Sequence, residues 1–213
     1  MDRLAGKVAI VTGAAARGEG IGNGTATAIL FAREGAKVVL VNRGAERAEA
    51  LAETIRAEGG EAAAFAADVT DPEATEAMAA FAVERYGRLD ILHNNVGVGA
   101  GGNTVTQSLE DWGRLIETNL TSAMLCCRAA IPRMRESGGG SIINVSSTAG
   151  VLGLSGTPGA VAYTATKGGL QALTLSVAAD HAAVYFASDE SRWVTGAMLS
   201  IDGGFQAIRP WPR

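Results

Sequence analysis

Cysteine is scarce in this chain, which has only Cys126 and Cys127 among its 213 residues. The two are adjacent in an apolar stretch, and neighbouring residues offer poor geometry for a disulfide bond. We interpret them as small hydrophobic side chains that are buried in the core. Because the sequence offers no disulfide framework, we expect a protein of the reducing cytoplasm.

Clusters of lysine and arginine are also lacking. The formal net charge is -4, and no basic patch is present that could neutralise the phosphates of DNA or RNA. A nucleic acid is therefore not expected as a partner. The apolar run in "MDRLAGKVAIVTG" is too short for the core of a secretion signal or for a membrane span, so no membrane association is expected. No group of histidine, cysteine or carboxylate residues has the spacing of a metal site, so no metal is expected.

Small and apolar residues are abundant, with 47% hydrophobic residues and 28 glycines. This composition is typical of a packed globular protein, and the length fits a single domain over residues 1–213. Short β-branched runs alternate with longer helical patterns. The predicted strands are 7–13, 37–43, 62–69, 89–95 and 141–147. This order predicts an α/β fold, a Rossmann-like doubly wound parallel sheet with helices on both faces.

Local signals place the ends of several helices. Gly35 is a suitable residue to close a helix over 25–34. Asp71 is expected to cap a helix whose first residue is Pro72, and Ser108 is expected to open a long helix. Pro132 should kink or end that long helix. The last predicted helix covers residues 163–179, and a further helix begins near residue 46.

A glycine-rich loop follows the first predicted strand, in "VTGAAARGEGIGNGTA". Between a buried strand and a helix, such a loop allows backbone N–H groups and the helix N-terminus to approach a pyrophosphate. The alternative is a flexible turn without a ligand, but the placement between strand and helix favours phosphate binding. We therefore expect a dinucleotide cofactor.

The end of the second predicted strand bears on the choice of cofactor. An NAD site usually has an acidic side chain there, whereas this chain has Asn42 and Arg43. A carboxylate would repel a 2′-phosphate and a guanidinium would attract one. The pattern therefore favours NADP over NAD, although Arg43 could equally be a solvated arginine at a strand end.

Several short motifs now occur in a specific order: the glycine loop, "DVTD", "NNVG", "TNL", "INVSS", "YTATK" and "TGAMLSIDGG". Together they resemble the short-chain dehydrogenase/reductase family, in particular its 3-oxoacyl reductases, over nearly the whole chain. The resemblance implies a secondary alcohol and a ketone as substrate pair, a nicotinamide cofactor and a homodimer or homotetramer. The alternative to an enzyme is a catalytically silent dinucleotide-binding or scaffold protein with the same fold.

Tyr163 and Lys167 are four residues apart, so both side chains project from one face of a helix. A free tyrosine is a poor base at neutral pH, and a nearby cation favours the phenolate. The resemblance implies that Tyr163 is the general acid and base and that Lys167 activates it. It also implies that Ser147, rather than Ser146, polarises the substrate carbonyl, and that Asn119 distorts its helix and positions a water.

The resemblance assigns cofactor contacts as well. Asp68 and Val69 are expected at the adenine, and Asn94 along the adenosine ribose. The full expected set of cofactor-binding residues is Gly13, Arg17, Gly22, Asn23, Gly24, Asn42, Arg43, Asp68, Val69, Asn94, Tyr163 and Lys167.

The chain departs from the family pattern in three places. The glycine loop is long, and counting back from the following helix makes Gly22 and Gly24 the second and third glycines. The segment from Ser147 to Tyr163 is longer than usual and apolar, so it is expected to shape the substrate mouth. After Asp180 we expect the sixth strand and the substrate lid to be missing, because "HAAVYFASDESRWVTG" follows directly. Either the C-terminal part is rearranged, or the sequence omits a stretch that is present in a parent protein.

Overall fold

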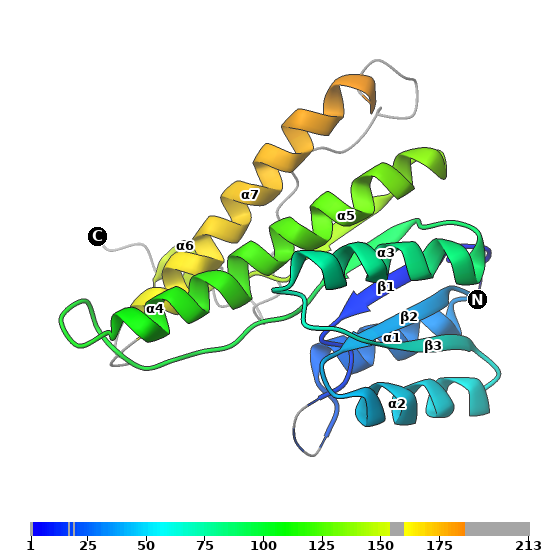
Figure 1. The fold of residues 1–213 in the computed structure, drawn as a ribbon, viewed down its shortest axis with the longest axis horizontal. Coiled ribbons are helices and arrows are strands. Elements are labelled where there is room, and N and C mark those ends of the chain that lie inside the picture. Colours follow the sequence, from blue (N-terminus) through cyan, green and yellow to red (C-terminus); the bar gives the residue numbers. More distant parts are fainter. Residues whose placement is uncertain (1, 17, 19, 154–159, 186–213) are drawn as a thin grey trace, which may run out of the picture.

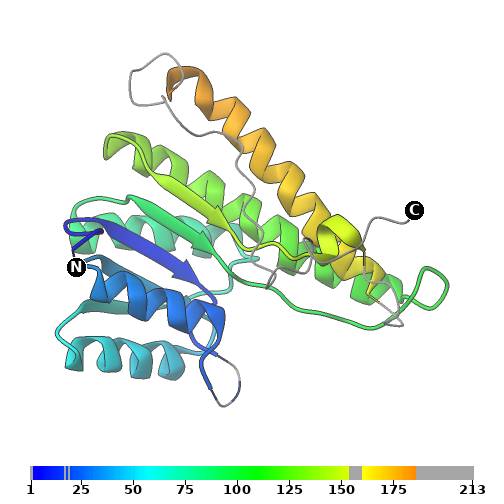
Figure 2. The ribbon, with the colours of Figure 1, turned by 180° about the vertical axis from the view of Figure 1, so that it is seen from behind.

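Residues 2–16, 18, 20–153 and 160–185 are described by a computed structural model (Figures 1 and 2). The strands are β1 (Val8–Thr12), β2 (Lys37–Asn42), β3 (Glu61–Ala66), β4 (Ile91–Asn94) and β5 (Ser141–Asn144). The helices are α1 (Asn23–Arg33), α2 (Ala45–Ala57), α3 (Pro72–Tyr86), α4 (Leu109–Ile116), α5 (Ser122–Glu136), α6 (Ala149–Leu152) and α7 (Val161–Tyr185). A π-helical turn, η1 (Glu117–Thr121), joins α4 to α5.

The five strands form one parallel sheet in the order β3-β2-β1-β4-β5. Helices α1 and α2 cover one face, as Figure 2 shows, and α3 and α5 cover the other, as Figure 1 shows. The predicted doubly wound parallel sheet is therefore confirmed. Among the described helices, none is long and apolar enough to cross a membrane.

The alternation of side chains along β2 explains why both faces of the sheet are apolar. Val38 and Leu40 pack with α1 and α2, whereas Val39 and Val41 pack with α3 and α5. All four are fully buried, because successive residues of a strand point to opposite faces. Cys126 and Cys127 lie in the α5 part of this core as free thiols, as expected.

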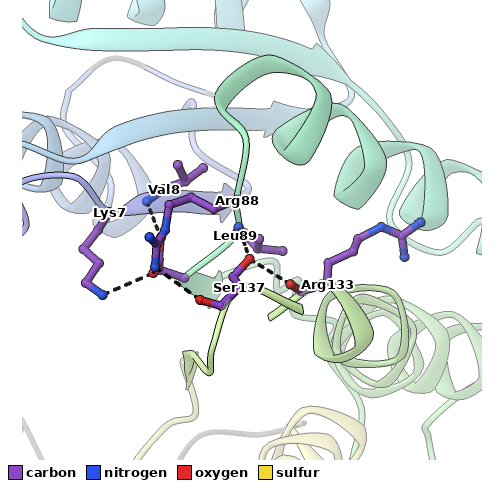
Figure 3. A network of polar contacts seen from close by, with 7 residues as sticks. Lys7, Val8, Arg88, Leu89, Arg133 and Ser137 are labelled. Atoms are coloured by element: carbon purple, nitrogen blue, oxygen red, sulfur yellow. Dashed lines mark hydrogen bonds and ion pairs between the residues drawn. The ribbon is translucent and has the colours of Figure 1, made fainter. Parts of the chain in front are cut away.

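The amino end of the sheet is held by the buried carboxylate of Asp90, just before β4 (Figure 3). It accepts hydrogen bonds from the backbone N–H of Val8 at 2.9 Å and from Lys7 Nζ at 3.2 Å. Arg88 donates through Nε at 2.8 Å and through Nη2 at 2.6 Å. Ser137, after α5, accepts from the N–H of Leu89. These contacts join β1, β4 and the end of α5 at the edge opposite the carboxyl ends of the strands.

The helix ends follow the local signals with one exception. Asp71 caps α3 by accepting from the N–H of Glu73, and Ser108 caps α4 by accepting from the N–H of Asp111. Gly35 follows α1 with a φ of 90°. Pro132, by contrast, lies inside α5, which continues to Glu136, so of the two expected effects it does not end the helix, and the kink stays a prediction. Only one turn follows it, and the missing N–H of Pro132 costs the helix one backbone hydrogen bond.

Two further expectations concern the last part of the chain. The predicted helix over 163–179 is longer in the structure, because α7 continues through Asp180 to Tyr185. The short helix α6 between β5 and α7 was not predicted. The expected absence of a sixth strand and lid concerns residues 186–213, which lie outside the described residues.

Candidate active site

Two adjoining cavities lie at the carboxyl ends of the strands, with volumes of about 510 and 500 Å³. They share Asn23, Asn95 and Gly97 in their walls. The first extends over the glycine-rich loop and the ends of β2 and β3, and the second reaches the first turns of α7. In parallel α/β sheets, ligands bind at this edge.

The glycine-rich turn forms one wall of the first cavity. Gly13 follows β1 with a φ of 60°, and Gly22 is the N-cap of α1. A Cβ on Gly24 would lie 2.3 Å from the carbonyl oxygen of Gly13 and 2.7 Å from Nδ2 of Asn95, so only glycine fits. The structure therefore has Gly22 and Gly24 in the register that the helix predicted. The N-terminus of α1, including Asn23, faces a cavity that suits the pyrophosphate of a dinucleotide. Arg17 lies outside the described residues.

The far end of the first cavity contains the residues expected near the adenosine. Asn42, Arg43, Asp68 and Val69 all line it. Arg43 Nη1 lies 3.5 Å from Asp68 Oδ2. Burial alone would raise the pKa of Asp68, but hydrogen bonds from the N–H and hydroxyl of Thr70, together with Arg43, hold this pKa below its ordinary value. The carboxylate is thus kept charged and able to accept a hydrogen bond.

Asn94, which the sequence predicted along the ribose, lines neither of the two cavities. Asn94 is buried on the α5 side of the sheet, where its Nδ2 donates to Asn144 Oδ1 at 2.9 Å and to Cys127 Sγ at 3.6 Å. Asn95 lines both cavities instead, and its Nδ2 donates to the carbonyl of Gly13 at 3.1 Å. A shift of one residue at a strand end moves a side chain to the other face of the sheet. Because two asparagines are adjacent here, the sequence does not show which of them faces the cavity.

Sequence reasoning missed several other residues that line the first cavity. Arg47 lies in the first turn of α2, four residues after Arg43, and this spacing could have indicated it. Arg114, Glu117 and Thr118 come from α4 and η1. Nothing in their local sequence indicates a ligand, because only the packing of α4 and η1 against α7 brings them to the cavity.

Tyr163 and Lys167 both line the second cavity, as their spacing predicted. Lys167 is 3% exposed, and its Nζ donates to the carbonyl of Val145 at 2.7 Å. This Nζ lies 5.9 Å from the centre of the Tyr163 ring. Burial lowers the pKa of Lys167 below its ordinary value. A buried cation thus lies beside the phenol in the wall of a cavity.

The two serines after β5 differ in their contacts. Ser146 lines the second cavity; its hydroxyl donates to the carbonyl of Lys167 at 2.8 Å and accepts from Gln171. Ser147 lies at the turn before α6, where its Oγ accepts from the N–H of Ala149 at 3.2 Å. Among the described residues Ser147 does not line the second cavity, because the strand ends at Asn144 and its alternation does not extend to the serines. Its expected role in polarising the substrate carbonyl stays a prediction.

Asn119 lies within η1 and is 1% exposed, so the expected distortion of the helix at this residue is confirmed. Its Oδ1 accepts from the N–H of Val98 at 2.8 Å, and its Nδ2 donates to the carbonyl of Val98 at 2.9 Å. The same Nδ2 donates to Oγ1 of Thr166 at 3.1 Å. The amide therefore joins the segment after β4, the π-helical turn and α7.

Comparison with known proteins agrees with this arrangement. The family model "short chain dehydrogenase" matches residues 7–185. The chain is 33% identical to 2,5-dichloro-2,5-cyclohexadiene-1,4-diol dehydrogenase LinX of Sphingobium indicum, over 96% of this chain and 98% of that protein. It is 36% identical to trans-4-hydroxycyclohexanecarboxylate dehydrogenase of Sinomonas cyclohexanicum, over 95% of this chain and 94% of that protein.

A solved structure is similar over nearly the whole chain. The crystal structure of a short-chain dehydrogenase/reductase from Burkholderia xenovorans has a TM-score of 0.88 and 35% identity, covering 99% of this chain and 100% of that one. The alignments with the two relatives above extend over 252 residues, more than the 213 residues here, so these relatives contain residues without a counterpart in this chain. This agrees with the expected deletion, and the family match ends where α7 ends.

The matched relatives and the glycine cradle together fix the general chemistry as oxidation and reduction with a nicotinamide dinucleotide. The structure agrees with such a cofactor, since the close approach of Gly24 to the Gly13 carbonyl places the N-terminus of α1 in the wall of the first cavity. The chain belongs to the short-chain dehydrogenase/reductase family and is an oxidoreductase.

Proposed function

We propose that this enzyme interconverts a secondary alcohol and a ketone, with Tyr163 as the general acid and base. The observation that carries the proposal is the buried Lys167 beside Tyr163, in a cavity continuous with the glycine cradle. When bound, the nicotinamide supplies or accepts the hydride. Tyr163 donates a proton to the ketone oxygen during reduction and takes it from the alcohol during oxidation.

Lys167 supports this proton transfer through its charge and its fixed position. Its ammonium is held by the carbonyl of Val145 at 2.7 Å, so it cannot move freely into water. A buried cation near a phenol stabilises the phenolate that forms when Tyr163 gives up its proton. Nζ has further donors available, because an ammonium has three hydrogens.

A serine hydroxyl is proposed to polarise the substrate carbonyl, and the hydrogen bonds favour Ser147 for this role. The Ser146 hydroxyl already donates its one hydrogen to the carbonyl of Lys167. Ser147 accepts from Ala149, which leaves its own hydrogen for a substrate oxygen. Ser146 instead holds the backbone of α7 at the residue that bears the ammonium.

We propose NADP rather than NAD as the preferred cofactor. Two guanidinium groups, on Arg43 and Arg47, line the end of the first cavity beside Asp68. Arg43 is within 3.5 Å of Asp68, whereas Arg47 has no ion pair within the described residues. Arg47→Ala is expected to lower kcat/KM for NADPH by about tenfold or more and to change the value for NADH little. An equal loss with both cofactors would contradict the preference.

A cyclic secondary alcohol is the substrate class that we propose. The relatives reported above act, by their names, on a cyclohexadiene diol and on a hydroxycyclohexanecarboxylate. Val98, Ala100 and Ala160 form the apolar part of the wall of the second cavity, beside polar residues such as Asn23, Asn95 and Ser146. An apolar wall with a few polar groups suits an uncharged ring that carries a hydroxyl. The 3-oxoacyl group that the sequence suggested is the competing class.

The test is spectrophotometric. Oxidation is followed at 340 nm (the NADPH band) with cyclohexanol, trans-4-hydroxycyclohexanecarboxylate and a 3-hydroxyacyl thioester, in the wild type and in Tyr163→Phe. We expect turnover with the ring alcohols and a loss of about a hundredfold or more in Tyr163→Phe. Full activity in Tyr163→Phe would contradict the mechanism. Calorimetric binding of NADPH without turnover of any substrate would instead support the silent binding protein.

We also propose that the enzyme is a homo-oligomer. Leu109, Trp112 and Met124 on α4 and α5, and Leu175 on α7, are exposed apolar side chains. Contact with a second copy would remove these surfaces from water. Light scattering of the purified protein should give the mass of a dimer or tetramer, and a monomer at micromolar concentration would contradict the proposal.

A further inference from the structure

Thr166 lies between Tyr163 and Asn119 and is fully buried. The proposed proton transfer does not use its hydroxyl. Its Oγ1 donates to the backbone carbonyl of Tyr163 at 2.8 Å and accepts from Asn119 Nδ2 at 3.1 Å. It is thus the covalent neighbour of Lys167 and a hydrogen-bonded neighbour of Tyr163. The hydroxyl lies between two groups whose relative positions matter for proton transfer.

The directions of these hydrogen bonds are fixed by the backbone. The N–H of Val98 can only donate and its carbonyl can only accept, and both contact the Asn119 amide. Asn119 must therefore direct Oδ1 to the N–H and Nδ2 to the carbonyl. The second hydrogen of Nδ2 then faces Thr166, whose oxygen must accept it. The hydroxyl hydrogen is left for the carbonyl of Tyr163, so every polar atom of the Asn119 amide is used.

We propose that Thr166 is a positioning residue that couples the π-helical turn at Asn119 to Tyr163 and holds the phenol in register with the segment at Val98. The proposal rests on the proposed role of Tyr163 in proton transfer. Loss of the hydroxyl leaves a buried N–H of Asn119 without its acceptor. Within the described part of the chain, no other side-chain hydrogen bond links η1 to the carbonyl of Tyr163. The first turn of α7 can then shift relative to the cavity wall.

The chain contains a matched control on the same helix. Thr174 also donates to a carbonyl of the preceding turn, that of Leu170 at 2.7 Å, and it accepts from Asn144 Nδ2 at 3.0 Å. Its two hydrogen bonds thus repeat those of Thr166 about two turns further along α7, away from Tyr163, at a residue that is partly rather than fully buried. Thr166→Val and Thr174→Val remove the same group with the same change of shape.

The kinetic test compares kcat and KM for a cyclic alcohol in the wild type, Thr166→Val, Thr166→Ser and Thr174→Val. We expect Thr166→Val to lower kcat by about 10- to 100-fold, because small displacements of a reacting group cost that much. KM for alcohol and cofactor should change less than about twofold, since the cavity walls are intact. Thr166→Ser should restore most of kcat, and Thr174→Val should retain it. If Thr166→Val does not fold, Thr166→Cys replaces it, because a cysteine side chain is similar in size but forms weaker hydrogen bonds.

A second readout does not depend on turnover. The N–H of Val98 is bonded to Asn119, so its hydrogen exchange measured by NMR reports on the position of that amide. Exchange should be about five- to tenfold faster in Thr166→Val, as for the loss of one hydrogen bond, and unchanged in Thr174→Val. It should also be unchanged in Tyr163→Phe, because the coupling uses only the backbone carbonyl of Tyr163.

The outcomes separate the two proposals. Wild-type kcat in Thr166→Val, equal losses in the two valine variants, or failure of Thr166→Ser to rescue would each overturn the positioning role. Full activity of Tyr163→Phe, or no turnover by the wild type, would overturn the proposed function. In that case the exchange of Val98 still decides: unchanged exchange in Thr166→Val overturns the coupling, and faster exchange supports it.

Discussion

Replacing Asp90 by asparagine tests the network that holds the amino end of the sheet. Asparagine has the same shape but no charge, and one of its two terminal groups is a donor. Asp90 accepts four hydrogen bonds, from Lys7, from the N–H of Val8 and twice from Arg88. An amide cannot accept all of them, because its NH2 group must face at least one donor.

The expected loss comes mainly from the buried end of the network. The carboxylate side chain is 4% exposed and Val8 is 1% exposed, so water cannot replace the charged acceptor of the Val8 N–H. The side chains of Arg88 and Lys7 are 41% and 49% exposed, and water can solvate their charges again. A hydrogen bond to a charged group contributes about 1.5 to 3 kcal/mol, so we expect Asp90→Asn to lower the free energy of unfolding by about 2 kcal/mol. For a chain of this length that corresponds to a fall in Tm of about 4 to 8 °C.

The effect should depend on pH in a defined direction. Burial alone would raise the pKa of Asp90, but the hydrogen bonds from Arg88, the Val8 N–H and Lys7 outweigh it and lower the pKa below the ordinary 3.8. The unfolded chain therefore binds this proton at a higher pH than the folded protein. The carboxylate contributes its full stability above pH 3.8 and loses it as the pH falls through the lower folded value. The difference between wild type and Asp90→Asn should be constant from pH 7 to about 5 and shrink below about 4.

Urea unfolding followed by circular dichroism measures this difference at pH 7, 5 and 3.5. Glu58→Gln is the matched control, since Glu58 also accepts two hydrogen bonds from one arginine, Arg33, but on the exposed surface. Its stability should be close to that of the wild type. If Asp90→Asn were as stable as Glu58→Gln at pH 7, or if its deficit persisted unchanged at pH 3.5, the argument from burial would be refuted.

Three further predictions concern the two cavities. Gly24→Ala should weaken NADPH binding in calorimetry by at least about tenfold, because its Cβ would meet the Gly13 carbonyl at 2.3 Å. Gly113→Ala, on α4 and with no atom within 4 Å of its Cβ, should bind NADPH normally, and equal weakening by both substitutions would argue against a rigid cradle. Ser147→Ala should lower kcat more than Ser146→Ala in the same assay, and the reverse order would transfer the polarising role to Ser146. Burial lowers the pKa of Lys167, so the ammonium should lose its proton at a pH below the ordinary 10.5. We therefore expect kcat to fall at an alkaline pH below that value. A kcat that stays constant up to and beyond pH 10.5 would contradict this.

Much of the site was accessible from local sequence patterns. Spacing on one helix predicted that Tyr163 and Lys167 share a face, and both line the second cavity. Counting back along the helix predicted the register of Gly22 and Gly24, because a helix packed on a sheet fixes the positions of its small residues. Both predictions depend only on the regular geometry of one element.

Predictions that crossed the end of an element were less successful. Asn94 and Asn95 differ by one position, and only the pairing of β4 with β1 and β5 decides which of them faces the glycine turn. The two serines present the same problem after β5, where the N–H of Ala149, the first residue of α6, donates to the Ser147 hydroxyl oxygen. Neither choice is encoded in spacing, because side-chain direction is no longer periodic once a strand ends.

The sequence by itself determined the doubly wound sheet, the buried cysteines, the glycine cradle and the Tyr163–Lys167 pair. Each follows from apolar periodicity, from the steric limits of glycine or from the pitch of a helix. Only the tertiary structure decided that Asn119 reaches Val98 and Thr166, and that Arg47 and Arg114 line the first cavity. These contacts join residues from separate elements, and the distances between them exist only once the helices have packed against the sheet.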